Sequence, residues 1–97
     1  MGDVDKITEG IIGCAIEVHR ELGPGLFEST YEAALCCELE ASGRRYRRQV
    51  PVSVSYKGKP VGEYRIDLLV EDAVIVEVKA VGRLDPIFDA QVLTYLR

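Results

Sequence analysis

Residues 66–79 read Ile-Asp-Leu-Leu-Val-Glu-Asp-Ala-Val-Ile-Val-Glu-Val-Lys, and this segment determines the architecture of the chain. Two apolar runs flank a central Glu-Asp pair, and short runs rich in Val, Ile and Leu are typical of β-strands. We therefore predict strands at residues 61–70 and 74–79, joined by a turn at the two acids. The second strand is apolar except for Glu77 and Lys79, which predicts a central position covered on both faces. A carboxylate in such a strand needs a partner or a function.

Three ionisable side chains of this segment can share one face of the sheet. Glu77 and Lys79 are two residues apart on a strand, so their side chains emerge on the same side. Asp67 joins them only if residues 70 and 74 are opposed across a three-residue connection. A two-residue turn would shift the register by one and turn the aspartate to the other face. A shared cluster therefore requires the three-residue connection, and we predict it.

Such a cluster suits the hydrolysis of phosphodiester bonds. Asp67 and Glu77 can hold Mg²⁺ or Mn²⁺, because these ions prefer carboxylate and water oxygens as ligands. The ion would orient the phosphate and lower the pKa of a bound water. Lys79 would position or deprotonate that water and stabilise the developing negative charge. The alternative is a cross-strand salt-bridge cluster on a solvated face.

The segments before this hairpin change from a helical to a strand period. Apolar residues at positions 4–22 recur at steps of three and four, which predicts a helix that ends at Gly23-Pro24. A second helix is predicted at residues 28–42, before Gly43. From residue 50 the period becomes two, which predicts a half-buried strand at 50–56, followed by a turn at 57–60.

The C-terminal segment carries the signals of a third helix. Asp85 is a suitable N-cap and Pro86 a favoured first helical residue, and apolar side chains follow to the end of the chain. The expected order is helix, helix, strand, strand, strand, helix. This order predicts a single α/β domain over residues 1–97, with a small, mainly antiparallel sheet flanked by helices.

Composition agrees with one small globular domain. The chain has 97 residues, of which 47% are hydrophobic and 29% charged, so neither disorder nor a fibrous repeat is indicated. No stretch approaches the roughly 20 apolar residues that span a bilayer, and the N-terminus lacks the pattern of a signal peptide. We expect a cytoplasmic protein without membrane contact. Its three cysteines, an odd number, are expected to be reduced thiols.

Charge is unevenly distributed along the chain. The net charge of −4 argues mildly against broad affinity for nucleic acid, because phosphate binding depends on Lys and Arg. Four arginines nevertheless lie within residues 44–48, and Lys57, Lys59 and Arg65 follow. This distribution allows a local basic face that contacts nucleic acid. The alternative for the arginine run is a solubilising edge of the sheet.

The arrangement of Asp67 and Glu77-x-Lys79 on a strand hairpin between helices resembles the PD-(D/E)XK nuclease superfamily. Residues 25–31, Gly-Leu-Phe-Glu-Ser-Thr-Tyr, read G-x-x-E-x-x-Y and resemble the signature of the GxxExxY proteins, a branch of that superfamily. Residues 91–95, Gln-Val-Leu-Thr-Tyr, are similar to the Q-x-x-x-Y motif of its exonuclease-like members. The resemblance implies a restriction-endonuclease-like core and a metal-dependent nuclease acting on DNA or RNA.

The resemblance also adds candidate residues outside the hairpin. It implies a third acidic group near the metal on the first core helix, here Glu28, whose alternative role is to complement the helix dipole. Gln91 and Tyr95 are four apart, so on a helix they would share a face and could contact the phosphate backbone or orient Lys79. Tyr31 is expected to be a core residue with a satisfied hydroxyl rather than a catalytic acid.

The chain departs from the superfamily pattern at two points. Ile66 stands where the motif has its proline, a change that leaves the metal-binding carboxylate in place. The core of the superfamily ends with a further strand after the last helix. We expect this chain to lack that C-terminal strand, so that the domain is C-terminally short. An open sheet edge would favour a homodimer. Two other functions stay open, namely a catalytically inactive module that binds nucleic acid or a protein partner, and a structural dimerisation domain.

Overall fold

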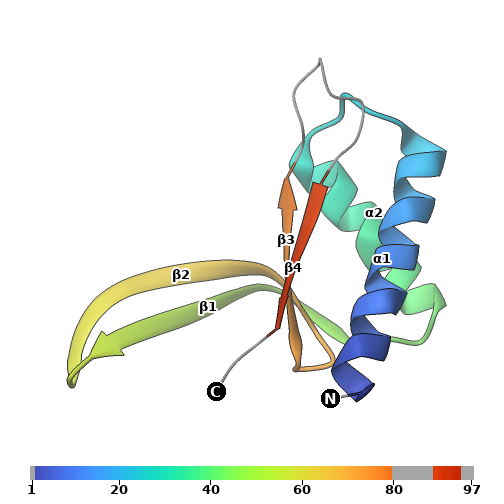
Figure 1. Cartoon of the computed structure of the whole chain (residues 1–97). Coiled ribbons are helices and arrows are strands. Elements are labelled where there is room, and N and C mark those ends of the chain that lie inside the picture. The colour runs from blue at the N-terminus through green and yellow to red at the C-terminus, as the bar shows by residue number, and fades with distance from the viewer. Residues whose placement is uncertain (1, 80–88, 95–97) are drawn as a thin grey trace.

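The computed structural model describes residues 2–79 and 89–94 and consists of two helices followed by a four-stranded sheet (Figure 1). In chain order, the elements are α1 (Gly2–Leu22), α2 (Glu28–Ala41), β1 (Tyr46–Tyr56), β2 (Lys59–Val70), β3 (Val74–Lys79) and β4 (Asp89–Thr94). Neither helix is long and apolar enough to cross a membrane. The predicted α/β class with a small antiparallel sheet is confirmed.

Both predicted N-terminal helices are present, and glycines end them as expected. Gly23 has a φ of 71°, and its N–H donates to the carbonyl of His19 at 2.8 Å. Gly43, with a φ of 77°, closes the end of α2 in the same left-handed conformation. Because only glycine adopts this conformation without steric cost, it is favoured just after the last turn of a helix.

The sheet is an antiparallel meander in the order β1-β2-β3-β4. A two-residue turn, Lys57-Gly58, joins β1 to β2, and both residues have positive φ (50° and 80°), as the favoured hairpin turns require. Three residues join β2 to β3, so that Val70 lies opposite Val74. The predicted connection is therefore confirmed.

One face of the sheet packs against both helices, which lie on the same side of it (Figure 1). The buried side chains of this core come from alternate positions of the strands and from one stripe of each helix, as the strand period of two and the helical period of 3.6 require. They are Ile11, Cys14, Val18, Tyr31, Leu35, Cys36, Leu39, Leu68, Val70, Val74, Val76 and Val78.

The hairpin of β1 and β2 extends well beyond the helical layer (Figure 1). Pairing between β2 and β3 is recorded only as far as Leu68 opposite Val76, whereas β1 and β2 continue to pair with each other to Tyr56 opposite Lys59. We call residues 50–66 the hairpin arm. Most of its side chains are exposed.

The predicted C-terminal helix is wrong for residues 89–94, which form β4 instead. This strand pairs antiparallel with β3, from Val74 opposite Thr94 to Lys79 opposite Asp89. A short apolar run of this kind fits either period, and pairing with β3 satisfies backbone groups that would otherwise form an open edge. The other residues of the predicted helix, 85–88 and 95–97, lie outside the described part of the chain.

The outer edge of β1 carries two features that oppose pairing with another strand. Gln49 has a φ of 53°, which breaks the regular extended conformation, and Pro51 has no backbone N–H to donate. Irregular residues and prolines are common devices for protecting edge strands.

Candidate active site

The strand register brings Asp67 and Glu77 together. Because Val70 lies opposite Val74 and Leu68 opposite Val76, the next position along the ladder places Asp67 beside Glu77. The backbone N–H of Val78 donates a hydrogen bond of 2.9 Å to Asp67 Oδ2. The side chain of Asp67 therefore points toward β3. It binds a backbone N–H just beyond Leu68 and Val76, the last backbone pair of β2 and β3.

The carboxyl group of Glu77 titrates above its usual range. Partial burial raises its pKa most, and the negative charge of Asp67 and a hydrogen bond with Asp67 raise it further. The positive charge of Lys79 lowers this pKa, and the charge of Glu32 makes the smallest contribution, in the upward direction. Asp67, Glu77 and Lys79 are thus close enough to interact, and the two acids repel each other when both are ionised.

The acid pair lies on the opposite side of the sheet from the helices. Leu68, Val76 and Val78 are buried in the helix-facing core. Side chains alternate between the two faces of a strand, so Asp67, Glu77 and Lys79 project from the other face. Asp67 and Glu77 are half-buried and Lys79 is exposed, an arrangement that leaves the cluster accessible to a ligand.

Sequence reasoning missed one acidic residue, Glu32. This residue lies on the inner face of α2, with only 7% of its surface exposed. Its carboxylate accepts hydrogen bonds from Arg48 Nε at 3.1 Å and from Gln49 Nε2 at 3.1 Å, and it forms an ion pair with Arg48 Nη2. A signal for it exists in the sequence, because Glu32 falls on the helical stripe of Leu35 and Leu39, where a carboxylate is unexpected.

Glu28, the acid that the sequence indicated, is exposed at the first residue of α2. This position suits the complementation of the helix dipole. The start of α2 and the end of β3 lie at the same end of the molecule (Figure 1), so Glu28 and the exposed Lys79 are at that end together.

Tyr31 is a core residue, as predicted. Its ring is 1% exposed, and its hydroxyl donates to the carbonyl of Gly23 at 2.7 Å and accepts from the N–H of Leu26 at 3.1 Å. These bonds tie the loop between the helices to α2. They give the tyrosine of the G-x-x-E-x-x-Y pattern a structural role rather than a catalytic one.

Of the two residues of the Q-x-x-x-Y pattern, only Gln91 belongs to the described part of the chain. Gln91 belongs to β4 and lies opposite Glu77 in the backbone register, so the interpretation of a shared helix face is wrong. It is nevertheless next to the acid pair along the sheet. Tyr95 lies outside the described residues.

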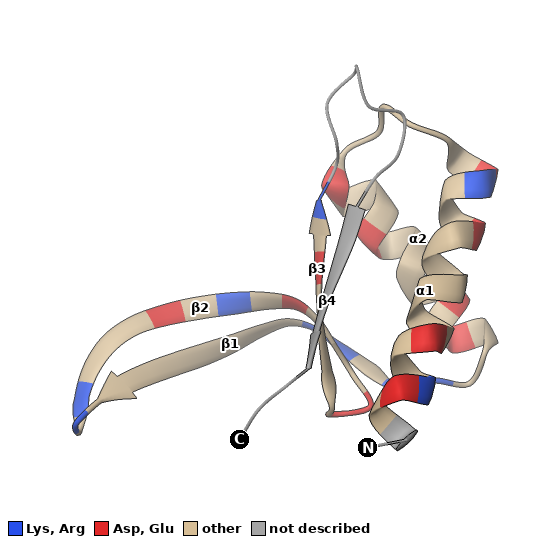
Figure 2. Ribbon diagram, viewed as in Figure 1, with Lys and Arg blue, Asp and Glu red and all other residues tan. Residues whose placement is uncertain are grey.

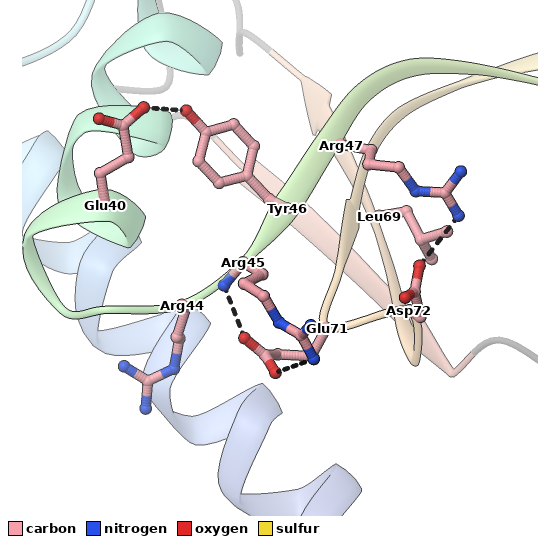
Figure 3. A pocket seen from close by; sticks show the side chains of 8 residues that line it. All are labelled: Glu40, Arg44, Arg45, Tyr46, Arg47, Leu69, Glu71 and Asp72. Atoms are coloured by element: carbon pink, nitrogen blue, oxygen red, sulfur yellow. Dashed lines mark hydrogen bonds and ion pairs between the residues drawn. The ribbon is translucent and has the colours of Figure 1, made fainter.

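The arginine run is largely neutralised by acids. Arg45 pairs with Glu71 at 3.7 Å, Arg47 with Asp72 at 2.9 Å, and Arg48 with Glu32. Figure 3 shows the first two pairs within an open pocket of about 610 Å³. The residues that line this pocket are Glu40, Arg44, Arg45, Tyr46, Arg47, Leu69, Glu71 and Asp72.

The same pocket holds a tyrosine with a perturbed hydroxyl. Tyr46 donates a hydrogen bond to the carboxylate of Glu40, and this bond raises the pKa of Tyr46 to about 12. Because three acids, Glu40, Glu71 and Asp72, line the pocket beside its three arginines, the pocket offers little net positive charge for a phosphate.

The donor set of Asp67 and Glu77 fits a magnesium-like ion. Within residues 2–79 and 89–94, no group of three His, Cys, Asp or Glu side chains is arranged to hold a metal. One or two carboxylates are enough for Mg²⁺, which keeps waters in its other positions. Two half-buried acids that lie side by side would also be stabilised by a bound dication.

Comparison with known families and proteins adds an independent finding. A family model described as PD-(D/E)XK nuclease superfamily matches residues 5–97. The match includes both helices almost entirely and the whole of the strand hairpin that carries Asp67, Glu77 and Lys79. Comparison with curated proteins and with solved structures gave no match.

Proposed function

The chain belongs to the PD-(D/E)XK nuclease superfamily, and on this basis we propose that it hydrolyses phosphodiester bonds of DNA or RNA with a divalent metal ion. The observation that carries the proposal is the position of Asp67 beside Glu77 in the strand register, where the N–H of Val78 fixes the aspartate. Burial and the charge of Asp67 raise the pKa of Glu77. Paired carboxylates of this kind are common at catalytic sites.

Asp67 and Glu77 are the proposed ligands of Mg²⁺ or Mn²⁺. Bound there, the ion would supply Lewis acidity for the phosphate and a water of lowered pKa. Asp67 is held in place because its Oδ2 accepts the hydrogen bond from Val78. Fixing a ligand in this way lowers the entropic cost of assembling the site.

Lys79 is the proposed cationic partner of the reacting phosphate. It lies two residues from Glu77 on β3 and lowers the pKa of that carboxyl, so its charge acts directly on the acid pair. An exposed ammonium at this position can bind a phosphate oxygen, position the attacking water and stabilise the charge that develops in the transition state.

Glu28 and Gln91 are proposed as secondary contacts. Glu28 lies at the end of α2 nearest the end of β3, and Gln91 lies opposite Glu77 in the ladder. Either could hold a metal-bound water or a phosphate oxygen. Tyr95 is kept as a prediction from the sequence pattern alone, and membership of the GxxExxY branch is proposed on residues 25–31.

There are two alternative functions. One is a catalytically inactive module that binds nucleic acid or a protein partner, and the other is a structural dimerisation domain. The irregular Gln49 and Pro51 oppose pairing through the edge of β1, which leaves β4 as the proposed edge for a homodimer.

Cleavage assays test the proposal. Labelled single-stranded DNA, duplex DNA and RNA are incubated with the protein in Mg²⁺, in Mn²⁺ and in EDTA. We expect metal-dependent cleavage that falls by about 10²-fold or more in Asp67→Asn, Glu77→Gln and Lys79→Ala. Glu9→Gln, on the exposed side of α1, is the control and should cleave at the wild-type rate. Equal cleavage by the three site variants and the control would show that the activity comes from elsewhere.

A further inference from the structure

The hairpin arm presents an exposed surface that the proposed chemistry does not use. Its exposed large side chains include Tyr56 at 63%, Val61 at 59% and Tyr64 at 64%. Apolar and aromatic groups of this size are usually buried, and a cluster of them on a projecting element commonly marks an interaction surface. The arm lies away from both helices (Figure 1), so the described part of the chain does not cover it.

The arm is positively charged although the chain is negative. Residues 50–66 contain the cations Lys57, Lys59 and Arg65 and one acid, Glu63, while the whole chain has a net charge of −4. Figure 2 shows basic segments at the tip of the hairpin and along β2. Within the described residues, no ion pair joins these three cations to an acid, in contrast to Arg45, Arg47 and Arg48.

One cation of β2 lies on the same face as the candidate active site. Arg65 is two residues from Asp67, so its side chain emerges on the face of the acid pair. Lys59 lies beyond the register shift at Val54 and Ser55 and pairs with Tyr56, so it emerges on the opposite face.

The tyrosines favour unpaired bases over a duplex. Lys57 Nζ lies 5.4 Å from the centre of the Tyr56 ring, so a cation and an aromatic face are presented together at the tip of the arm. Tyr64 lies opposite Val52, which is four residues from Tyr56 on β1, so both exposed rings emerge on one face of the hairpin and are available to stack on bases. Basic grooves with aromatic platforms are characteristic of single-strand binding, because a duplex already stacks its own bases.

We propose that the hairpin arm binds single-stranded nucleic acid and that Arg65, two residues from Asp67, connects this surface to the candidate active site. The binding surface stands on the charge and exposure of the arm alone, whereas its role in guiding a substrate rests on the proposed nuclease function. The occupant is a single strand of DNA or RNA, recognised through its phosphates and its exposed bases and without sequence readout.

Fluorescence anisotropy of the full chain in EDTA tests the binding surface without cleavage. The probes are labelled 20-nucleotide oligo-dT and oligo-U and a 20-base-pair duplex. The test variant replaces Lys57, Lys59 and Arg65 with Gln. The matched control replaces Arg44, Arg45 and Arg47 with Gln, which removes the same charge from neighbouring positions, two of which already have acidic partners. Circular dichroism checks that each variant is folded.

We expect the arm variant to bind oligo-dT or oligo-U at least 10-fold more weakly than the wild type, and the control to change by less than about 3-fold. Loss of three phosphate contacts should also lower the slope of log affinity against log salt by about 2. Replacing Tyr56 and Tyr64 with Ser should weaken single-strand binding by about 5-fold or more for each ring.

Three results would overturn the proposal: no binding of either single strand by the wild type at low salt, equal losses in the arm variant and the control, or a preference for the duplex. Cleavage is measured separately in Mg²⁺. If the wild type cleaves and the arm variant binds as tightly as the wild type, the proposed binding surface is wrong and the proposed nuclease function stands. If the protein binds through the arm but never cleaves, the proposed nuclease function is wrong and the binding surface stands.

Discussion

The carboxylate of Asp67 accepts a hydrogen bond of 2.9 Å from the backbone N–H of Val78 on the neighbouring strand. This contact gives Asp67 two roles. As an acceptor it satisfies a backbone donor of a residue that is 2% exposed, and as an anion it faces Glu77. The two roles can be separated, because an amide oxygen can replace the acceptor but not the charge.

Asp67→Asn keeps the acceptor and removes the repulsion with Glu77, so it should be at least as stable as the wild type, whereas Asp67→Ala should lose about 1–3 kcal/mol because the Val78 N–H is left without its acceptor. Urea denaturation in EDTA measures both. Equal destabilisation of the two variants would indicate that the hydrogen bond contributes little. Both variants should lose metal binding, since each lacks one carboxylate.

Glu77→Gln should stabilise the metal-free protein at neutral pH. The pKa of Glu77 is raised in the folded state, so this group contributes stability below its unfolded pKa, and the contribution is lost as pH rises through the folded pKa. Above the folded pKa of Glu77 its charge lies beside that of Asp67, and removing it relieves the repulsion. A gain on the order of 1 kcal/mol would raise Tm by about 4–8 °C for a domain of this size.

Thermal unfolding in EDTA and in Mg²⁺, at pH 4 and at pH 7, tests this expectation. The advantage of Glu77→Gln should be present in EDTA at pH 7 and smaller at pH 4. In Mg²⁺ the wild type should gain stability and the variant should not. A variant that is less stable than the wild type in EDTA at pH 7 would contradict the assigned repulsion.

The pair of Glu32 and Arg48 should respond asymmetrically to substitution. The side chain of Glu32 is 9% exposed, whereas that of Arg48 is 45% exposed. Removing the arginine leaves a buried carboxylate with only Gln49 as a partner, so Arg48→Met should cost about 3 kcal/mol. Glu32→Gln leaves an arginine that water can reach, and it should cost about 1 kcal/mol. Chemical denaturation measures both, and the reverse order would contradict the burial of Glu32.

Gly13→Ala in α1 should stabilise the protein by about 0.5–1 kcal/mol, because alanine costs less conformational entropy in a helix. A Cβ atom at Gly13 meets nothing within 4 Å. Gly10 provides the comparison, since a Cβ there would lie 2.1 Å from the guanidinium of Arg44 and would displace that side chain. Gly10→Ala should gain less than Gly13→Ala in thermal unfolding, and a larger gain would contradict this packing.

The register of the hairpin could be predicted from the sequence, because Asp67 and Glu77 share a face only if three residues connect the two strands. The structure has this three-residue connection. The two N-terminal helices were also predictable, because their helical patterns extend over 21 and 14 residues and end before Gly23 and Gly43. Long periodic segments with glycine stops leave little ambiguity.

Other features depended on tertiary contacts that a local pattern does not contain. The segment of Gln91 was predicted as a helix from Asp85-Pro86, but its backbone pairs with β3 instead. The buried Glu32 depends on Arg48, which is 16 residues away in the chain, and the neutralised arginine run depends on acids of the β2–β3 turn. Partners that are this far apart in the chain can be identified only when the register of the strands is known.

Asp67 and Glu77 are proposed to bind one divalent ion between them. Anomalous difference density from a crystal of the full chain soaked in Mn²⁺ tests this binding. We predict a peak within coordinating distance of both carboxylates in the wild type and its loss in Glu77→Gln. A saturating soak that leaves this position empty, or an ion bound only at other residues, would contradict the claim.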